Sequence, residues 1–110
     1  MKNFVLLFRG GLVQEKSPEL WQNHMVKWKE WMDGLGQSGR LVGGQQLKQD
    51  GKVMRKDKNQ IIDRPYAEAK EIVGGFLTLK ANDQQEAIDI AKGCPIFEFD
   101  GTCEVAEIVN

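Results

Sequence analysis

The sequence predicts an α+β domain in which apolar strand segments alternate with two amphipathic helices. An unbroken apolar run occupies residues 4–8, and apolar residues recur every three or four positions between Pro18 and Ser38. A second, shorter helical pattern follows Asp83. With 110 residues, the chain is long enough for a single domain over residues 1–110 with a core of its own.

Composition and charge exclude several classes of protein. Charged residues make up 28% of the chain, hydrophobic residues make up 41%, and the net charge is −1 with both signs interspersed. A neutral chain lacks the positive charge that nucleic-acid binding requires, so we expect no nucleic-acid partner. The apolar run near the N-terminus is too short for a signal peptide or a membrane span, so we expect a cytoplasmic protein with no membrane partner.

Cysteine and histidine usage argues against a metal site. Cys94 and Cys103 lie far from the single histidine, and their spacing matches no zinc motif. In a reducing compartment we expect both cysteines to be free thiols. We therefore expect neither a metal nor a cofactor, and we interpret Cys94 as a packing residue rather than a nucleophile.

The first third of the chain is predicted to contain a strand and the longer helix. The apolar run lacks alternation, which predicts a strand over residues 3–9 buried on both faces. Ser17 is a suitable N-cap before Pro18, and Gly39 suits the position just after the helix end. One apolar stripe along this helix comprises Trp21, Met25, Trp28, Met32 and Leu35.

The middle of the chain is predicted to be strand-rich. Residues 40–48 form a strand, Asp50-Gly51 is a hairpin turn, and residues 52–55 return. Residues 56–59 are predicted to form another polar turn, followed by a short strand over residues 60–63. A longer strand covers residues 75–80.

The last third is predicted to contain the second helix and two strands. Asp83 caps this helix, with Glu86 as its capping-box partner. We expect strands over residues 96–99 and 102–109. The core-facing residues of the helix are predicted to be Ala87, Ile88 and Ala91.

This order of elements is the ferredoxin-like split βαβ pattern with an inserted β-hairpin. Two helices cover only one face of a four-stranded sheet, yet the strands over residues 3–9 and 75–80 are apolar on both faces. The open face predicts a partner, and a second copy packed sheet to sheet is the simplest one. The alternative is a monomer whose inserted hairpin folds over the open face.

One segment resembles a known family. Asp63-Arg64-Pro65-Tyr66, with a Gly74-Gly75-Phe76 strand start downstream, is similar to the Asp-Gly-Pro-Phe signature of YCII-related (DGPF) proteins. The resemblance implies a dimeric α/β barrel made of two ferredoxin-like subunits, in a family without a defined general activity. Further matching stretches lie at residues 8–10, 24–32, 91–96 and 103–105.

The chain departs from the family pattern at three positions. Arg64 replaces the signature glycine and Tyr66 replaces the phenylalanine. An arginine before Pro65 favours β or polyproline II angles, so a family turn that needs a positive φ at that glycine would have to differ here. Ala106 stands where many relatives carry arginine, which removes any anion contact from that position.

His24 is the candidate catalytic base. It lies inside the apolar arc of the first helix, where partial desolvation favours a neutral imidazole. A neutral histidine in a cleft can accept a proton near pH 7, and Asp63 is the candidate catalytic carboxylate beside it. The alternative is a core histidine whose ring is satisfied by a backbone carbonyl, and the residues leave both interpretations open.

The segment after Asp63 supplies further candidates. Glu68, Lys70 and Glu71 form either a solvated loop or a lid over a cavity, in which Lys70 holds an anionic group. The glycine pair before Phe76 either lets backbone approach a ligand or forms a β-bulge. The remaining candidate ligand-binding residues are Arg9, Trp28, Gln46, Tyr66 and Gly75. An ion pair with a surface carboxylate is an alternative role for Arg9.

Two functions follow from these observations. The first is a homodimer with one cleft per subunit that binds a small, anionic organic molecule, with cofactor-free acid–base catalysis by His24. The second is a non-enzymatic dimeric interaction or regulatory module, which predicts an exposed loop and no enclosed polar pocket. Cavity geometry distinguishes the two.

Overall fold

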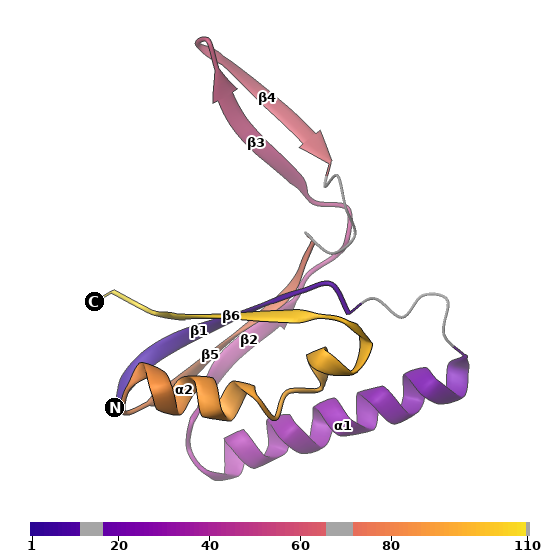
Figure 1. The fold of residues 1–110 in the computed structure, drawn as a ribbon, viewed down its shortest axis with the longest axis vertical. Helices are drawn as coiled ribbons and strands as arrows, with labels where there is room; N and C mark the ends of the chain where they lie inside the picture. Colours follow the sequence, from indigo (N-terminus) through magenta and orange to yellow (C-terminus); the bar gives the residue numbers. More distant parts are fainter. Residues whose placement is uncertain (12–16, 66–71, 110) are drawn as a thin grey trace.

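The computed structural model describes residues 1–11, 17–65 and 72–109, with residues 62–65 described as backbone alone. Within these residues the chain forms six strands, two α-helices and one 3-10 helix (Figure 1). In chain order the elements are β1 (Lys2–Arg9), α1 (Pro18–Gln37), β2 (Leu41–Gln46), β3 (Lys52–Asp57), β4 (Gln60–Pro65), β5 (Val73–Ala81), α2 (Gln84–Ala91), η2 (Pro95–Phe99) and β6 (Thr102–Glu107).

Four strands form the main sheet, in the order β2-β5-β1-β6 with all neighbours antiparallel. Both α-helices lie on one side of this sheet (Figure 1). The arrangement is compatible with the predicted ferredoxin-like fold, with β3 and β4 inserted between its second and third strands.

The core lies between the sheet and the two helices. Phe4 of β1 pairs with Leu79 of β5, and Leu6 pairs with Leu77, so these side chains share one face. All four are fully or almost fully buried, together with Ala87 and others in a single cluster. The alternation of buried and half-buried residues along β1 and β5 follows directly from the two-residue repeat of a strand.

The helix start signals are confirmed. Ser17 Oγ accepts a hydrogen bond from the backbone N–H of Leu20 at 3.1 Å, with Pro18 at the first helical position. Asp83 Oδ1 accepts one from the N–H of Glu86 at 2.8 Å. Each cap satisfies a backbone donor that the helix itself leaves unpaired.

The hairpin predicted around Asp50-Gly51 is wrong, whereas the turn predicted over residues 56–59 is confirmed. β2 pairs with β5, and the hairpin is formed by β3 and β4 around Lys58 and Asn59. These two residues have φ values of 49° and 68°. Two consecutive positive φ angles give the turn whose twist matches that of the flanking strands, whereas Asp50-Gly51 lies in the connection that leads to β3.

The strand predicted over residues 96–99 is also wrong, because these residues form the 3-10 helix η2. Cys94 caps it and Pro95 occupies its first turn, where a missing N–H costs nothing. Asp100, at φ 60°, ends it, and the N–H of Gly101 donates to the Ile96 carbonyl at 3.1 Å. In α2, Ile90 packs against the core beside the predicted Ala87 and Ala91.

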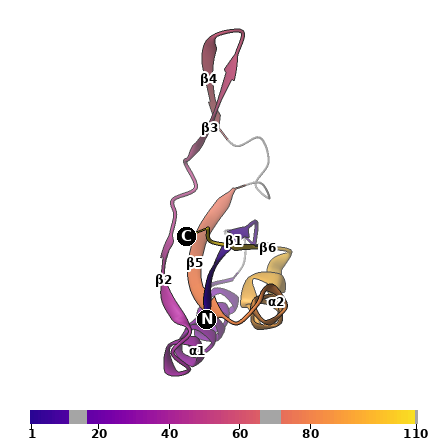
Figure 2. The ribbon, with the colours of Figure 1, turned by 90° about the vertical axis from the view of Figure 1, so that its left-hand side faces the viewer.

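The second face of the sheet carries Val5, Leu7, Phe76 and Thr78, all half-buried. In the described part of the chain, no helix lies over this face (Figure 1). The β3–β4 hairpin, which we call the arm (residues 52–65), extends beyond the end of the sheet and does not fold back over it (Figure 2).

Candidate functional site

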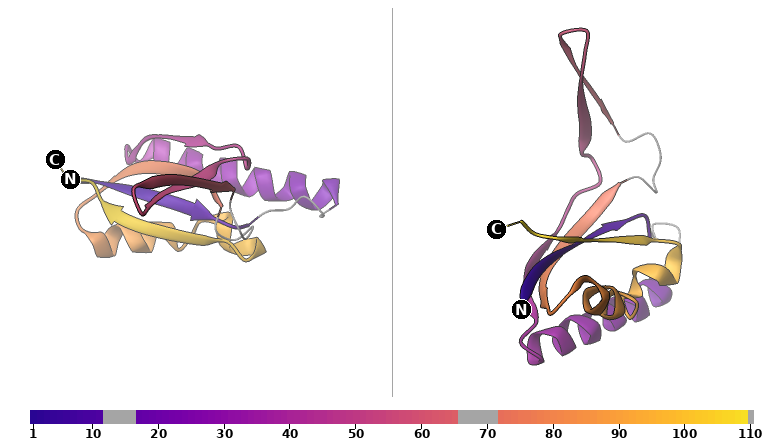
Figure 3. Two further views of the ribbon diagram at one scale, coloured as in Figure 1. Left: turned by 90° about the horizontal axis from the view of Figure 1, so that it is seen from above. Right: turned by 60° about the vertical axis from the view of Figure 1, so that its left-hand side comes forward.

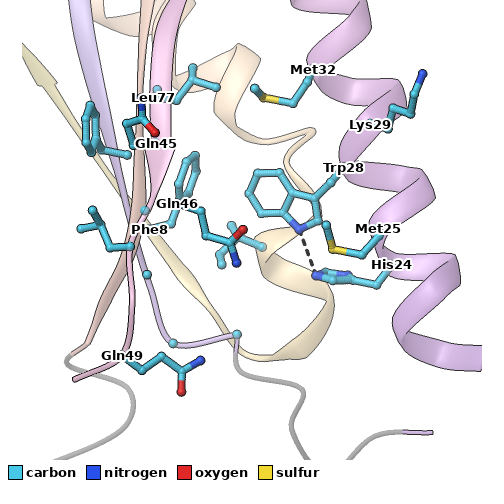
Figure 4. A pocket seen from close by; sticks show the side chains of 18 of the residues that line it. Phe8, His24, Met25, Trp28, Lys29, Met32, Gln45, Gln46, Gln49 and Leu77 are labelled. Carbon is cyan, nitrogen blue, oxygen red and sulfur yellow. Dashed lines mark hydrogen bonds between the residues drawn. The ribbon is translucent and has the colours of Figure 1, made fainter. Parts of the chain in front are cut away.

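A cleft opens between α1 and the sheet. Figure 1 shows α1 and β2 diverging from the turn that joins them, so the space between them widens toward the start of the helix. The resulting cleft has a volume of about 890 Å³. Its helix wall includes His24, Met25, Trp28 and Met32, and its sheet wall includes Gln46 and Leu77 (Figure 4). Trp21 on the helix and Gly44 and Gly75 on the sheet also line it.

Glycines shape the sheet wall of the cleft. The β1–β5 register pairs Phe8 with Gly75 and Arg9 with Val73, which leaves Gly74 as the extra residue of a β-bulge. Both glycines of this pair also line the cleft, so the bulge and the close approach to a bound molecule are compatible roles. On β2, a Cβ atom added to Gly44 would lie 2.5 Å from the Phe76 carbonyl oxygen, so only glycine fits there.

His24 and Trp28 form a hydrogen-bonded pair on the helix wall (Figure 4). The Trp28 Nε1–H donates to His24 Nε2 at 2.9 Å. An indole N–H can only donate, so Nε2 must be the unprotonated nitrogen and Nδ1 carries the proton. The four-residue spacing on α1 brings the two rings together, and the Trp28 ring also meets Phe8 edge to face at 5.2 Å.

The other His24 nitrogen is bound by Glu98 of η2. His24 Nδ1–H donates to Glu98 Oε2 at 2.9 Å, and Lys27 Nζ donates to Oε1 of the same carboxylate at 2.9 Å. These hydrogen bonds, that from His24 first and then that from Lys27, lower the pKa of Glu98 below its ordinary value. Lys27, Glu98, His24 and Trp28 therefore form a continuous chain that ties α1 to η2 and fixes one wall of the cleft.

This chain restricts what His24 can do. His24 is 3% exposed, and both of its ring nitrogens have partners. Before Nε2 can take a proton from a ligand, the Trp28 indole must turn away from it. In the described conformation, the ring instead holds Trp28 in the cleft wall.

The cleft brings together four of the residues singled out in the sequence, namely His24, Trp28, Gln46 and Gly75. Arg9 is not in the cleft lining and pairs with Glu104 at 2.7 Å. The backbone of Asp63 lies in the arm, opposite Met54. Tyr66, Glu68, Lys70 and Glu71 lie outside the described residues.

Sequence reasoning missed Glu98, the carboxylate that binds His24. The incorrect strand over residues 96–99 hid it, although the Cys94-Pro95 pair signals a helical start. The sequence predicts Met25 and Met32 only as members of an apolar stripe, and the structure places both in the cleft wall.

The cysteines are both free thiols. Burial raises the pKa of Cys94 to about 12 and that of Cys103 to about 11, so neither is a thiolate at neutral pH. Among the side chains that the structure describes, no three from His, Cys, Asp or Glu gather as metal ligands. Neither described α-helix is long and apolar enough to cross a membrane.

The fold and the cleft define a small α+β protein with a cavity large enough for a small organic molecule. The family model for the YCII-related domain matches residues 8–110, and the chain belongs to this family. A comparison with curated proteins found no match.

Proposed function

We propose that this protein is a homodimer that binds one small organic molecule in the cleft beneath α1 of each subunit. The observation that carries the proposal is the cleft itself. Its volume of about 890 Å³ falls within the range of small-molecule sites, which are mostly apolar with a few fixed polar groups. Trp28 and Met25 supply apolar wall, and Gln45 and Gln46 supply polar groups.

The half-buried open face supports the dimer. Val5 and Leu7 of β1 and Phe76 of β5 stand on the face that the helices leave uncovered. Two such faces packed together would bury these side chains and form the barrel of two ferredoxin-like sheets that family membership suggests.

The residues of the cleft wall bear on the charge of the ligand and on the chemistry that His24 can perform. Apart from His24, Lys29 is the charged residue among the described residues of the cleft, and its Nζ pairs with Asp33 at 2.9 Å. Binding of an anionic ligand therefore depends on Lys70, which lies outside the described residues. Cofactor-free acid–base chemistry by His24 requires a ligand that displaces the Trp28 indole from Nε2. The proposed function is therefore ligand binding, and catalysis by His24 follows only if the bound ligand displaces the Trp28 indole.

A thermal-shift screen with a panel of small metabolites tests the proposal. A compound present at 100 times its Kd stabilises a protein by about 2.7 kcal/mol, which is a readily measured shift in Tm. We expect hits that stabilise the wild type and lose their effect in His24→Ala and Gln46→Leu. Gln22→Leu on the exposed side of α1 is the matched control and should keep the effect.

Equal shifts in all four proteins would place the ligand elsewhere and contradict the proposal. A panel without any hit would favour the non-enzymatic dimeric module.

A further inference from the structure

The arm is an extended hairpin that its own subunit leaves unburied. All residues from 52 to 61 are exposed. Three of them are large and apolar, with Val53 exposed by 51%, Met54 by 64% and Ile61 by 68%. A lone two-stranded hairpin is at best marginally stable in water, so a hairpin with three exposed apolar side chains needs a surface to pack against.

The charge of the arm is opposite to that of the rest of the chain. Residues 52–65 carry five basic and two acidic residues, whereas the remainder of the chain carries ten basic and fourteen acidic ones. The basic residues of the arm are Lys52, Arg55, Lys56, Lys58 and Arg64. Opposite charges favour association, so the body of this same protein is an electrostatically suitable surface for the arm.

The direction of the arm indicates whether it contacts its own subunit or a second copy of the chain. The arm and α1 lie at opposite ends of the long axis, with the main sheet between them (Figures 1 and 3). A hairpin that leads away from its own core cannot pack on it. A second copy placed on the open face of the sheet would instead stand on the side toward which the arm projects.

We propose that the arm clasps a second copy of this chain and buries Met54 and Ile61 against the body of that copy. This inference rests on the homodimer of the proposed function and assigns a second contact region to it, beyond the sheet faces. The apolar residues supply burial, and Arg55 and Lys56 supply attraction to the more acidic body.

Photo-crosslinking tests the contact directly. Protein carrying Met54→p-benzoylphenylalanine is made in ¹⁵N-labelled form, mixed with unlabelled wild type, irradiated and digested. We expect cross-linked peptides that join a labelled arm to an unlabelled body segment. The matched control is Val26→p-benzoylphenylalanine on α1, a site of similar exposure (54%) away from the arm, which should give none.

Sedimentation equilibrium supplies the energetic test. The double variant Met54→Ser/Ile61→Ser should raise the dimer Kd by at least about tenfold, because two buried apolar side chains are lost. The control Val26→Ser/Val109→Ser, also on exposed apolar residues, should leave the Kd unchanged. Arg55→Glu/Lys56→Glu should raise the Kd more at low salt than at high salt.

The outcomes separate this inference from the proposed function. A wild type that stays monomeric at all concentrations would overturn both the dimer and the clasp. A stable wild-type dimer with an unchanged Kd in Met54→Ser/Ile61→Ser and no inter-chain cross-link from position 54 would overturn the clasp alone. An inter-chain cross-link together with a raised Kd would support it.

Discussion

The two ends of α1 face the same sheet and behave differently. Near its C-terminal end, Leu35 belongs to a sealed cluster with Phe4 and Leu79, both of which are fully buried. Near its start, Trp21 and Met25 of the same stripe stay 40% and 41% exposed beside the cleft. One apolar stripe of α1 therefore packs into the core at its C-terminal end and lines the cleft near its start. The difference arises because α1 diverges from β2 toward the start of the helix.

The largest loss of stability should come from truncating a side chain in the buried cluster at the C-terminal end of α1. Leu79→Ala removes a fully buried side chain and should cost about 2–5 kcal/mol of unfolding free energy, through lost transfer energy and a residual cavity. Met25→Ala at the cleft end should cost less than about 1 kcal/mol, because its side chain is already partly in water. Urea denaturation of both variants checks this, and equal losses would remove the distinction between the two ends.

The next effect concerns the glycines of β2. Gly44→Ala forces a Cβ atom against the Phe76 carbonyl oxygen and should cost about 1–3 kcal/mol. Gly43→Ala is the matched control, since no atom outside its chain neighbours lies within 4 Å of its added Cβ, and it should change stability by at most about 0.5 kcal/mol. A similar loss of unfolding free energy in both variants, measured by urea denaturation, would show that the backbone at Gly44 shifts to accommodate the added Cβ atom.

A double-mutant cycle measures the Trp28–His24 hydrogen bond. Trp28→Phe removes the only donor that His24 Nε2 has among the described residues, and His24→Ala removes the acceptor. We expect a coupling energy of about 1 kcal/mol between the two substitutions, obtained from the unfolding free energies of the wild type, both single variants and the double variant. Additive effects would show that the bond does not hold the cleft wall.

Glu98 should give the cleft wall a pH dependence. Its pKa is lowered by the hydrogen bond from His24 and then by that from Lys27, so its carboxylate stabilises the fold above its ordinary pKa of 4.5, and this contribution is lost as the pH falls through the lower folded-state value. The stability difference between wild type and Glu98→Gln should therefore narrow as the pH is lowered below about 4.5. Urea denaturation at several pH values checks this, and a constant difference would contradict the assigned partners.

The smallest expected effect is a difference in the alkylation rates of the two cysteine thiols, which measures how well each is buried. With pKa values raised to about 12 for Cys94 and about 11 for Cys103, neither should react readily with iodoacetamide at pH 8. As the pH rises, Cys103 should be alkylated before Cys94, as read by mass spectrometry, and urea-unfolded protein should react quickly at both. Earlier alkylation of Cys94 would contradict the burial described for it.

Local patterns in the sequence predicted most of the fold. The apolar run of β1, the stripe of α1 and the caps at Ser17 and Asp83 depend on neighbours within a few residues, where propensity and periodicity act directly. Asp50-Gly51 is a strong turn signal that wrongly predicted a hairpin at that position, whereas Lys58 and Asn59, in the polar turn predicted over residues 56–59, adopt the angles of the observed hairpin turn.

The candidate site was predictable only in part. The stripe predicted which side of α1 is apolar, but the width of the gap opposite it depends on how β2 and β5 cross the helix. Glu98 is 74 positions from His24, and no local pattern joins residues so far apart. The two were brought together by η2, the element that the sequence analysis misassigned.

The indole resonances in ¹H–¹⁵N NMR test the central claim, that the cleft end of α1 is a ligand site. Trp21 and Trp28 line the cleft, whereas Trp31 on the same helix packs against the core and is not in the lining. Titration with the compound that gives the largest thermal shift should move the Trp28 and Trp21 indole signals and leave that of Trp31 in place. Movement of Trp31 alone, or of none of the three, would contradict a ligand site in this cleft.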